Sequence, residues 1–283
     1  MQVEPVPARP QFVSMYAAYL ARRLKPSSIR QYMNIVRLLH IENGYENPCK
    51  ENWHLQSTLK GIDRLLGAAV VRKTPITPTI LLRFRNYLNL HLVFDSYFWA
   101  TCVVLFFGMF RKSNLLADTV GSFSADKQFI RSDFTMAGKY VLVRVKYSKT
   151  IQCKEREYIV KLPVLNSPLC PVTALLHAFS TVPLAPEAPA FVSNSKGSPL
   201  TGPAFTNRLK ELVSLCGEDP RLFASHSFRR GSAVWALSAG IPGEIIKQMG
   251  DWKSSVYLRY LDTIPHKVLD SYVDMFSSCL PIL

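Results

Sequence analysis

The sequence predicts a mainly α-helical protein with a small β-hairpin, arranged as a short helical domain followed by a larger α+β domain. Three observations support this fold class. Apolar residues recur at helical spacing along much of the chain, two stretches near its middle alternate apolar and polar side chains, and proline-containing segments separate these patterns. A chain of 283 residues is also long enough for two domains, each with its own core.

The N-terminal part is predicted to be an arm followed by three helices. Residues 1–10 contain three prolines and no periodicity, so we expect a flexible arm. Apolar stripes then predict one helix from Phe12, a second after Pro26 and a third over residues 52–66. The expected all-helical unit therefore covers residues 11–69.

A linker and a second domain are expected next. Segment 70–78 contains Arg72, Lys73 and two prolines, which is typical of a linker. Residues 79–283 form the predicted second domain, which begins with helices. Its most apolar stretch, Tyr97–Phe110, is shorter than the roughly 20 residues that a membrane span needs, so it is predicted to be a buried helix.

The centre of the second domain is predicted to hold the hairpin. Residues 140–150 alternate apolar and polar side chains, and residues 157–162 do so again, which predicts two strands joined by a polar turn. Helices return after Pro171, and the proline- and serine-rich stretch 181–203 is expected to be loop. An amphipathic pattern over residues 268–276 predicts a last helix, which either packs on its own domain or docks on a neighbouring protomer.

The charge balance points to a polyanionic partner. The chain carries 34 basic and 20 acidic residues, a formal net charge of +14, and residues 1–74 alone carry 11 basic and five acidic groups. Nucleic acid is the leading candidate for such a partner. The six cysteines are scattered singly, without the pairs or Cys/His clusters of zinc sites, so we expect reduced thiols, no metal and no cofactor. We expect no secretory signal and no membrane association.

Several basic side chains are candidates for contacts with the phosphates of a DNA duplex. Six of them lie outside the apolar stripes of the first unit, one lies in the linker and one follows a motif described below. They are Arg22, Arg23, Lys25, Arg30, Lys60, Arg64, Lys73 and Arg230. The alternative interpretation, a solvated helix face, stays open for each of them.

The C-terminal part holds a constellation suited to phosphodiester chemistry. His226 and Arg229 lie three residues apart and so share one helix face, where a guanidinium can bind two phosphate oxygens and an imidazole can move a proton. Trp252 carries an N–H that can only donate, and Tyr260, eight positions later, offers a phenolic oxygen as a nucleophile. Tyr257 is a competing nucleophile.

This ordered set resembles the catalytic domain of tyrosine recombinases, in which an arginine, a lysine, an H-x-x-R, a histidine or tryptophan and a tyrosine follow one another. The resemblance extends upstream to an apolar helix with a glycine-containing turn before Arg111 and to the Ser-Lys-Thr triplet at 148–150. It implies the catalytic set Arg111, Lys149, His226, Arg229, Trp252 and Tyr260. Lys146 is the alternative lysine.

The family resemblance covers roughly residues 10–265 and implies a function. The first unit resembles the helical, SAM-like core-binding domain of these enzymes, and the second their catalytic domain. Members cleave and rejoin double-stranded DNA through a covalent 3′-phosphotyrosyl intermediate, commonly in a tetrameric synapse. One departure concerns Asn114, because many members carry an acidic residue three places after the first arginine.

The amino-acid sequences of three motifs resemble those of one branch of the family. Residues 148–152, 169–172 and 250–255 are similar to the recombinases of eukaryotic mobile elements of the Crypton and DIRS-like (Ngaro) kinds. This branch implies DNA integration in the nucleus. Two other functions remain open: a domesticated DNA-binding protein without turnover, and a type IB topoisomerase.

Overall fold

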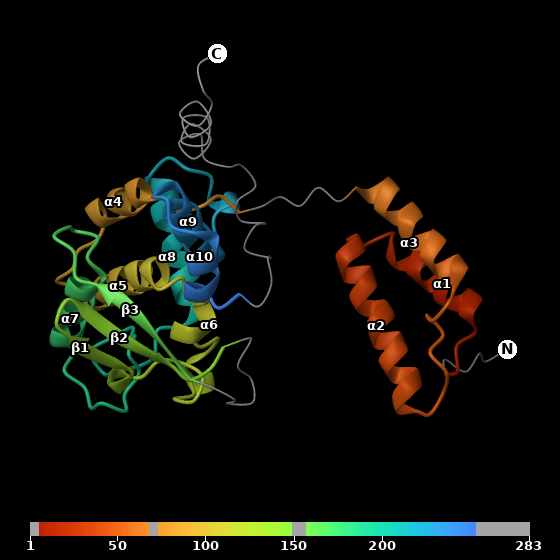
Figure 1. Cartoon of the computed structure of the whole chain (residues 1–283), viewed down its shortest axis with the longest axis horizontal. Coiled ribbons are helices and arrows are strands. Elements are labelled where there is room, and N and C mark those ends of the chain that lie inside the picture. The colour runs from red at the N-terminus through yellow and green to blue at the C-terminus, as the bar shows by residue number, and fades with distance from the viewer. Residues whose placement is uncertain (1–5, 68–72, 149–156, 253–283) are drawn as a thin grey trace, which may run out of the picture. The chain divides into compact units, whose positions relative to one another are not determined.

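A computed structural model describes residues 6–67, 73–148 and 157–252 of the chain. The chain divides into two compact units, Met1–Val71 and Arg72–Leu283. Both are mainly helical, and the second contains a small antiparallel sheet (Figure 1). The predicted fold class is therefore confirmed.

The first unit is built from three helices, as the apolar stripes predicted. They are α1 (Pro10–Leu20), α2 (Pro26–Glu42) and α3 (Trp53–Leu66). A proline in the first helical turn begins α1 and α2, where its missing N–H costs no hydrogen bond. Helix α3 begins after Asn52, whose side chain accepts a hydrogen bond from the Leu55 amide. A small core holds the helices together: Val13, Ala17, Ile29, Met33, Leu55 and Ile62.

The start of the chain is attached to this unit at Ala8. The buried imidazole of His40 accepts a hydrogen bond from the Ala8 amide at Nε2, over 2.7 Å, and its Nδ1 lies 2.7 Å from the Val36 carbonyl oxygen. Residue 8 belongs to the segment that the sequence predicted as a flexible arm. A neutral imidazole meets both contacts, since Nδ1 then donates while Nε2 accepts.

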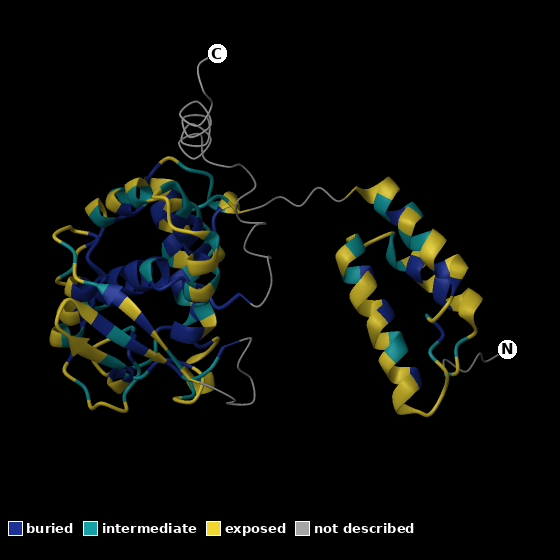
Figure 2. Ribbon diagram, in the orientation of Figure 1, coloured by how far each residue is buried: buried dark blue, intermediate teal, exposed yellow. Residues whose placement is uncertain are grey.

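The second unit places its helices around a buried central helix. The helices in its described residues are α4 (Pro78–Asn86), α5 (Val93–Phe107), α6 (Lys112–Leu115), α7 (Pro171–Thr181), α8 (Gly202–Leu215), α9 (His226–Ser238) and α10 (Gly243–Met249). Three 3-10 turns accompany them: η1 (Val120–Ser122), η2 (Arg131–Asp133) and η3 (Pro220–Leu222). Every residue of α5 from Asp95 to Phe106 is buried, as Figure 2 shows. This is the helix that the apolar run predicted, and α4, α7 and α9 pack against it.

The sheet has three antiparallel strands in the order β1, β2, β3. Strands β2 (Tyr140–Val145) and β3 (Tyr158–Pro163) are the predicted hairpin, paired so that Val143 faces Val160. Alternation along β2 buries its valines on one face, as period-2 patterning requires. The sequence did not predict β1 (Phe134–Ala137), because four mostly exposed residues carry too little alternation to be recognised.

Residues 73–76, which the sequence placed in the linker, belong to the second unit and hydrogen-bond to its later segments. The Thr74 amide donates to the Leu222 carbonyl over 2.7 Å, and the Ile76 amide donates to the Ser227 carbonyl over 3.0 Å. Ile76 is fully buried. The carbonyl of Ile76 approaches α9 so closely at Gly231 that a Cβ there would lie 1.7 Å from its oxygen. This contact fixes the first turns of α9, which carry His226 and Arg229.

Candidate active site

Four of the six residues predicted to be catalytic lie in the described part of the chain. Arg111 immediately precedes α6, His226 and Arg229 stand in the first turn of α9, and Trp252 follows α10. The guanidinium of Arg229 lies over Trp252, a carboxylate lies beside Arg111, and His226 is close enough to both arginines for their charges to lower its pKa. Lys149, Tyr260 and the competing Tyr257 lie outside the described residues, as does the helix expected over residues 268–276.

Arg229 joins two turns of the site. Its side chain is buried, and its guanidinium donates hydrogen bonds to the carbonyl oxygens of Met109 and Gly250. The same guanidinium lies over the ring of Trp252, with its central carbon 4.1 Å from the ring centroid. This is a cation–π contact between largely buried groups, a geometry in which such contacts are strongest. Arg229 thereby fixes Trp252 beside the turn that leads to Arg111.

The two turns that Arg229 joins have unusual backbones. Met109 and Asp251 both adopt φ of 49°, in the left-handed region that side chains other than glycine rarely occupy. Gly250, between α10 and Asp251, has no room for a Cβ, which would lie 1.9 Å from the Trp252 ring. Such conformations persist only where the surrounding structure enforces them, and they cluster at functional sites.

Trp252 also packs with apolar neighbours. It is 8% exposed and belongs to a small cluster with Met109, Ala233, Ala236 and Ile246. The tryptophan therefore contributes to packing between α9, α10 and the Met109 turn as well as to the contact with Arg229. Neither role excludes the other, since an indole offers both an apolar body and a polar N–H.

Arg111 is positioned by its backbone and faced by a carboxylate. The side chain of Asn114 accepts a hydrogen bond from the Arg111 amide over 3.1 Å and donates to the Tyr147 carbonyl over 2.7 Å. Asn114 thus closes the first turn of α6 and supplies no charge. A carboxylate oxygen of Asp251 instead lies 3.7 Å from a guanidinium nitrogen of Arg111, in a pair whose side chains are 22% and 5% exposed.

Ser148 completes a chain of polar contacts that the sequence did not predict. Its hydroxyl donates to the same carboxylate oxygen of Asp251 over 2.7 Å, and both residues are buried. Two motifs contained the signal: Ser148 begins the Ser-Lys-Thr triplet, and Asp251 is the acidic residue inside the Gly-Asp-Trp triplet. A carboxylate within a basic, aromatic motif indicates a specific cationic partner, but the sequence does not say which one.

The surroundings of His226 favour its neutral form. The residue keeps an exposed surface, but the protein around its ring and the cations of Arg229, Arg111 and Arg230 lower its pKa below the usual 6.5. Burial is the larger cause, since it disfavours the charged imidazolium, and the arginines add like-charge repulsion. A neutral imidazole at neutral pH is able to accept a proton.

The alternative lysine, Lys146, has an internal partner. Its ammonium lies 2.7 Å from a carboxylate oxygen of Asp133, whose side chain is fully buried, and donates to the Ala125 carbonyl over 2.7 Å. Arg144 pairs with the same carboxylate over 3.2 Å. Lys146 would therefore have to leave a buried carboxylate in order to reach DNA.

The residues proposed to contact DNA fall into two groups. Five of those in the first unit are exposed on its helices or on the turn between α1 and α2: Arg22, Arg23, Lys25, Lys60 and Arg64. Arg30 is exposed as well, but it forms polar contacts within the protein, as Lys73 and Arg230 do. Arg30 forms a two-point ion pair with Asp63, Lys73 donates to the Arg221 carbonyl, and Arg230 donates to the Lys73 carbonyl over 2.9 Å.

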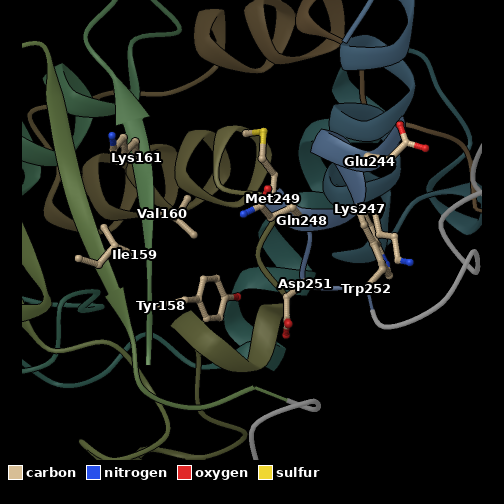
Figure 3. A pocket seen from close by; sticks show the side chains of 10 residues that line it. All are labelled: Tyr158, Ile159, Val160, Lys161, Glu244, Lys247, Gln248, Met249, Asp251 and Trp252. Carbon is tan, nitrogen blue, oxygen red and sulfur yellow. The ribbon is translucent and has the colours of Figure 1, made fainter. Parts of the chain in front are cut away.

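A cavity of about 650 Å³ opens beside the site, between β3 and α10 (Figure 3). Asp251 and Trp252 form part of its wall, and Tyr158 points toward Asp251 from the opposite side. The remaining lining residues are Ile159, Val160, Lys161, Glu244, Lys247, Gln248 and Met249. Within the described ranges, no cluster of His, Cys, Asp and Glu is arranged to hold a metal.

Two further findings concern sequence expectations. Cys49, Cys102, Cys170 and Cys216, the cysteines in the described part of the chain, are free thiols. No helix among the described residues is both long and apolar enough to span a bilayer.

The chain matches no protein-family model. It is 24% identical over 269 residues to the integrase/recombinase XerD homologue of Selenomonas ruminantium, and the match covers 92% of this chain and 75% of that protein. Several solved structures have similar folds, including the following two. The XerH site-specific recombinase bound to palindromic difH substrate, in a post-cleavage complex, matches with a TM-score of 0.64 and 14% identity over 94% of this chain and 72% of the other. A lambda integrase dimer bound to a COC′ core site matches with a TM-score of 0.59 and 13% identity, over 93% of this chain and 83% of the other.

Proposed function

We propose, from the tyrosine recombinase and integrase fold that this chain adopts, that it breaks and rejoins double-stranded DNA by strand exchange. One observation carries the proposal: Arg111, His226, Arg229 and Trp252, from three separate parts of the chain, gather at one site. Similarity to the XerD homologue and to two DNA-bound recombinase structures supports the same function.

The proposed reaction is a transfer of a phosphoryl group from DNA to Tyr260 and back. The phenolic oxygen of Tyr260 attacks the scissile phosphorus and forms the 3′-phosphotyrosyl bond, while the bond from phosphorus to the 5′-oxygen breaks. The phenolic proton passes to neutral His226, and Lys149 donates a proton to the departing 5′-oxygen. Rejoining reverses these transfers with a 5′-hydroxyl from another strand.

Charge stabilisation is the proposed task of the two arginines. As the tyrosine attacks, negative charge grows on the nonbridging phosphate oxygens, and preorganised cations lower the energy of that state. Arg111 is the more accessible of the two, since Arg229 is only 2% exposed and holds two carbonyl oxygens and the indole. A phosphate would therefore meet Arg111 and His226 first.

The wider setting is also proposed. The sequences of the motifs at 148–152, 169–172 and 250–255 support the proposal that the chain is a recombinase of a Crypton or DIRS-like mobile element and acts in the nucleus. Exchange between two duplexes requires four cleavages, so we propose a homotetramer on DNA, with the exposed cations of the first unit contacting the phosphate backbone.

Trapping the covalent intermediate tests this function. A library of duplexes, each nicked near a different candidate site, should give a protein–DNA adduct that survives denaturation, because release of the short strand prevents rejoining. Tyr260→Phe should abolish the adduct, whereas Tyr257→Phe should retain it. No adduct on any duplex contradicts strand exchange and favours an idle DNA-binding protein. An adduct that persists in Tyr260→Phe contradicts the choice of nucleophile, and relaxation of supercoils without sequence preference indicates a type IB topoisomerase.

A further inference from the structure

We propose that Asp251 is a positioning residue that holds the Arg111 guanidinium where it meets the scissile phosphate, with Ser148 fixing the carboxylate. The inference rests on the proposed strand-exchange function and adds to its site a residue that the six-residue catalytic set lacks. One carboxylate oxygen of Asp251 accepts from the Ser148 hydroxyl over 2.7 Å and lies 3.7 Å from Arg111. The contacts link three segments: the residues that follow β2, the start of α6 and the turn after α10.

The surroundings of Asp251 restrict its carboxylate to this place. Its backbone adopts the left-handed conformation with φ of 49°, and its side chain is only 5% exposed. The hydroxyl of Ser148, itself buried, fixes one oxygen. A carboxylate that cannot rotate into solvent is able to orient its cationic neighbour, in the way that preorganised groups reduce the cost of reaching a reactive geometry.

Asn114 cannot perform this task, although it stands where many members of the family carry an acidic residue. Its amide oxygen accepts from the Arg111 backbone, and its amide nitrogen donates to the Tyr147 carbonyl. Both ends of the side chain are therefore used for local structure, and neither carries charge. The Arg111 side chain, by contrast, is 22% exposed and has five N–H donors, so a phosphate can bind it while Asp251 holds it.

The competing explanation is that Asp251 only supports the fold. Changing the charge of the substrate distinguishes this explanation from a role that acts through Arg111. In a methylphosphonate, a methyl group replaces one nonbridging oxygen of the scissile phosphate and removes the charge that Arg111 would neutralise. A residue that acts through Arg111 should matter on the ordinary phosphodiester and much less on the methylphosphonate. A residue that only supports the fold should matter equally on both.

The experiment uses the full chain and the nicked duplex that gives the strongest adduct, made with either linkage at the scissile position. Asp251→Asn keeps the shape of the side chain and removes its charge. We expect it to slow adduct formation by about 10-fold to 100-fold on the phosphodiester, and to leave the rate on the methylphosphonate close to that of the unsubstituted chain. Arg111→Ala should show the same pattern. Glu187→Gln removes one exposed negative charge elsewhere in the second unit and should change neither rate.

A second variant guards against misfolding. Ser148→Ala removes only the hydroxyl that fixes the carboxylate, and it should slow the phosphodiester reaction less than Asp251→Asn does, again sparing the methylphosphonate. If Asp251→Asn fails to fold, as judged from its unfolding curve, Ser148→Ala decides the question on the same two substrates.

The outcomes separate this inference from the function on which it rests. Equal slowing of both substrates, or no slowing of the phosphodiester, overturns the role of Asp251 while leaving strand exchange intact. An unsubstituted chain that forms no adduct on any duplex overturns strand exchange, and the role of Asp251 with it.

Discussion

Arg229 contributes to structure and to the proposed chemistry through the same guanidinium. It donates to the carbonyls of Met109 and Gly250 in two turns that contain the left-handed residues Met109 and Asp251, and it stacks on Trp252. These contacts explain how a cation can be buried in a positively charged protein, since carbonyl oxygens and an indole face replace its lost hydration.

Replacing Arg229 with lysine should therefore destabilise the protein. One ammonium cannot reach both carbonyls and also present a flat face to the indole. We expect Arg229→Lys to lower the free energy of unfolding by about 2 to 4 kcal/mol, measured by urea denaturation. Arg221→Lys, at an exposed ion pair with Asp219, should have a much smaller effect. Equal effects of the two changes would contradict the role given to the buried contacts.

The protonation of His226 gives a second prediction at this scale. NMR titration should find its midpoint below 6.5, because burial and the arginines disfavour the imidazolium. Arg230→Gln removes one of these cations and should raise the midpoint. The unfolded chain binds this proton more readily than the folded one, so the stabilising contribution is complete above about pH 6.5 and falls as the pH drops below it. A midpoint at or above 6.5 would contradict this account.

Helix α9 is the element that determines the site, because its first turn carries His226 and Arg229. Its position depends on the contact with residues 73–76, where Ile76 donates to the Ser227 carbonyl and passes over Gly231. At the other side, α10 packs against the same helix, and Trp252 in the turn after α10 packs with its residues Ala233 and Ala236. The site is thus built where three segments meet at one helix end.

Gly231→Ala tests this arrangement. In an isolated helix the change would stabilise by about 1 kcal/mol, but here the new Cβ would lie 1.7 Å from the Ile76 carbonyl oxygen. We expect a loss of about 1 to 3 kcal/mol in the free energy of unfolding, measured by thermal or urea denaturation. Gly61→Ala in α3 is the matched control, because nothing lies within 4 Å of its Cβ position, and it should be neutral or stabilising. Stabilisation by both changes would show that the contact at Ile76 is loose.

For the molecule as a whole, the charge of +14 and its spread over both units favour binding along a phosphate backbone. Binding of this kind releases counterions from DNA, so its affinity depends on salt. The proposed contacts in the first unit are exposed side chains, including Arg30. Arg30 differs from the others because it forms an ion pair with Asp63.

Salt dependence of DNA binding should reflect that difference. We expect affinity to fall by about 1,000-fold or more between 50 and 200 mM salt if about six or more phosphates are contacted. Arg23→Gln should lower the slope of log affinity against log salt by about one. Arg30→Gln should change the slope less, because the ion pair with Asp63 competes with DNA for this cation. Fluorescence anisotropy with a labelled duplex measures both, and an unchanged slope in Arg23→Gln would remove that residue from the interface.

Much of the architecture is determined by the sequence itself. The periodicities that predicted the three N-terminal helices, the buried α5 and the β2–β3 hairpin are local, and each repeats within a few residues. The motifs around Arg111, His226, Arg229 and Trp252 were recognisable for the same reason, since each is a short run of neighbouring residues. Strand β1 escaped because four residues do not establish a period.

Tertiary structure alone decided the partners of these residues. The contact from Ser148 to Asp251 spans 103 positions, and that from Arg229 to Met109 spans 120. No local sequence pattern predicts which distant segments will pack together. The sequence therefore specified the residue types of the site. Packing decided that Asp251 faces Arg111, that Lys146 forms an ion pair with Asp133 and that Arg229 is buried. The physical reason is that hydrogen-bonding and apolar periods act between near neighbours, while ion pairs and burial depend on which surfaces meet in space.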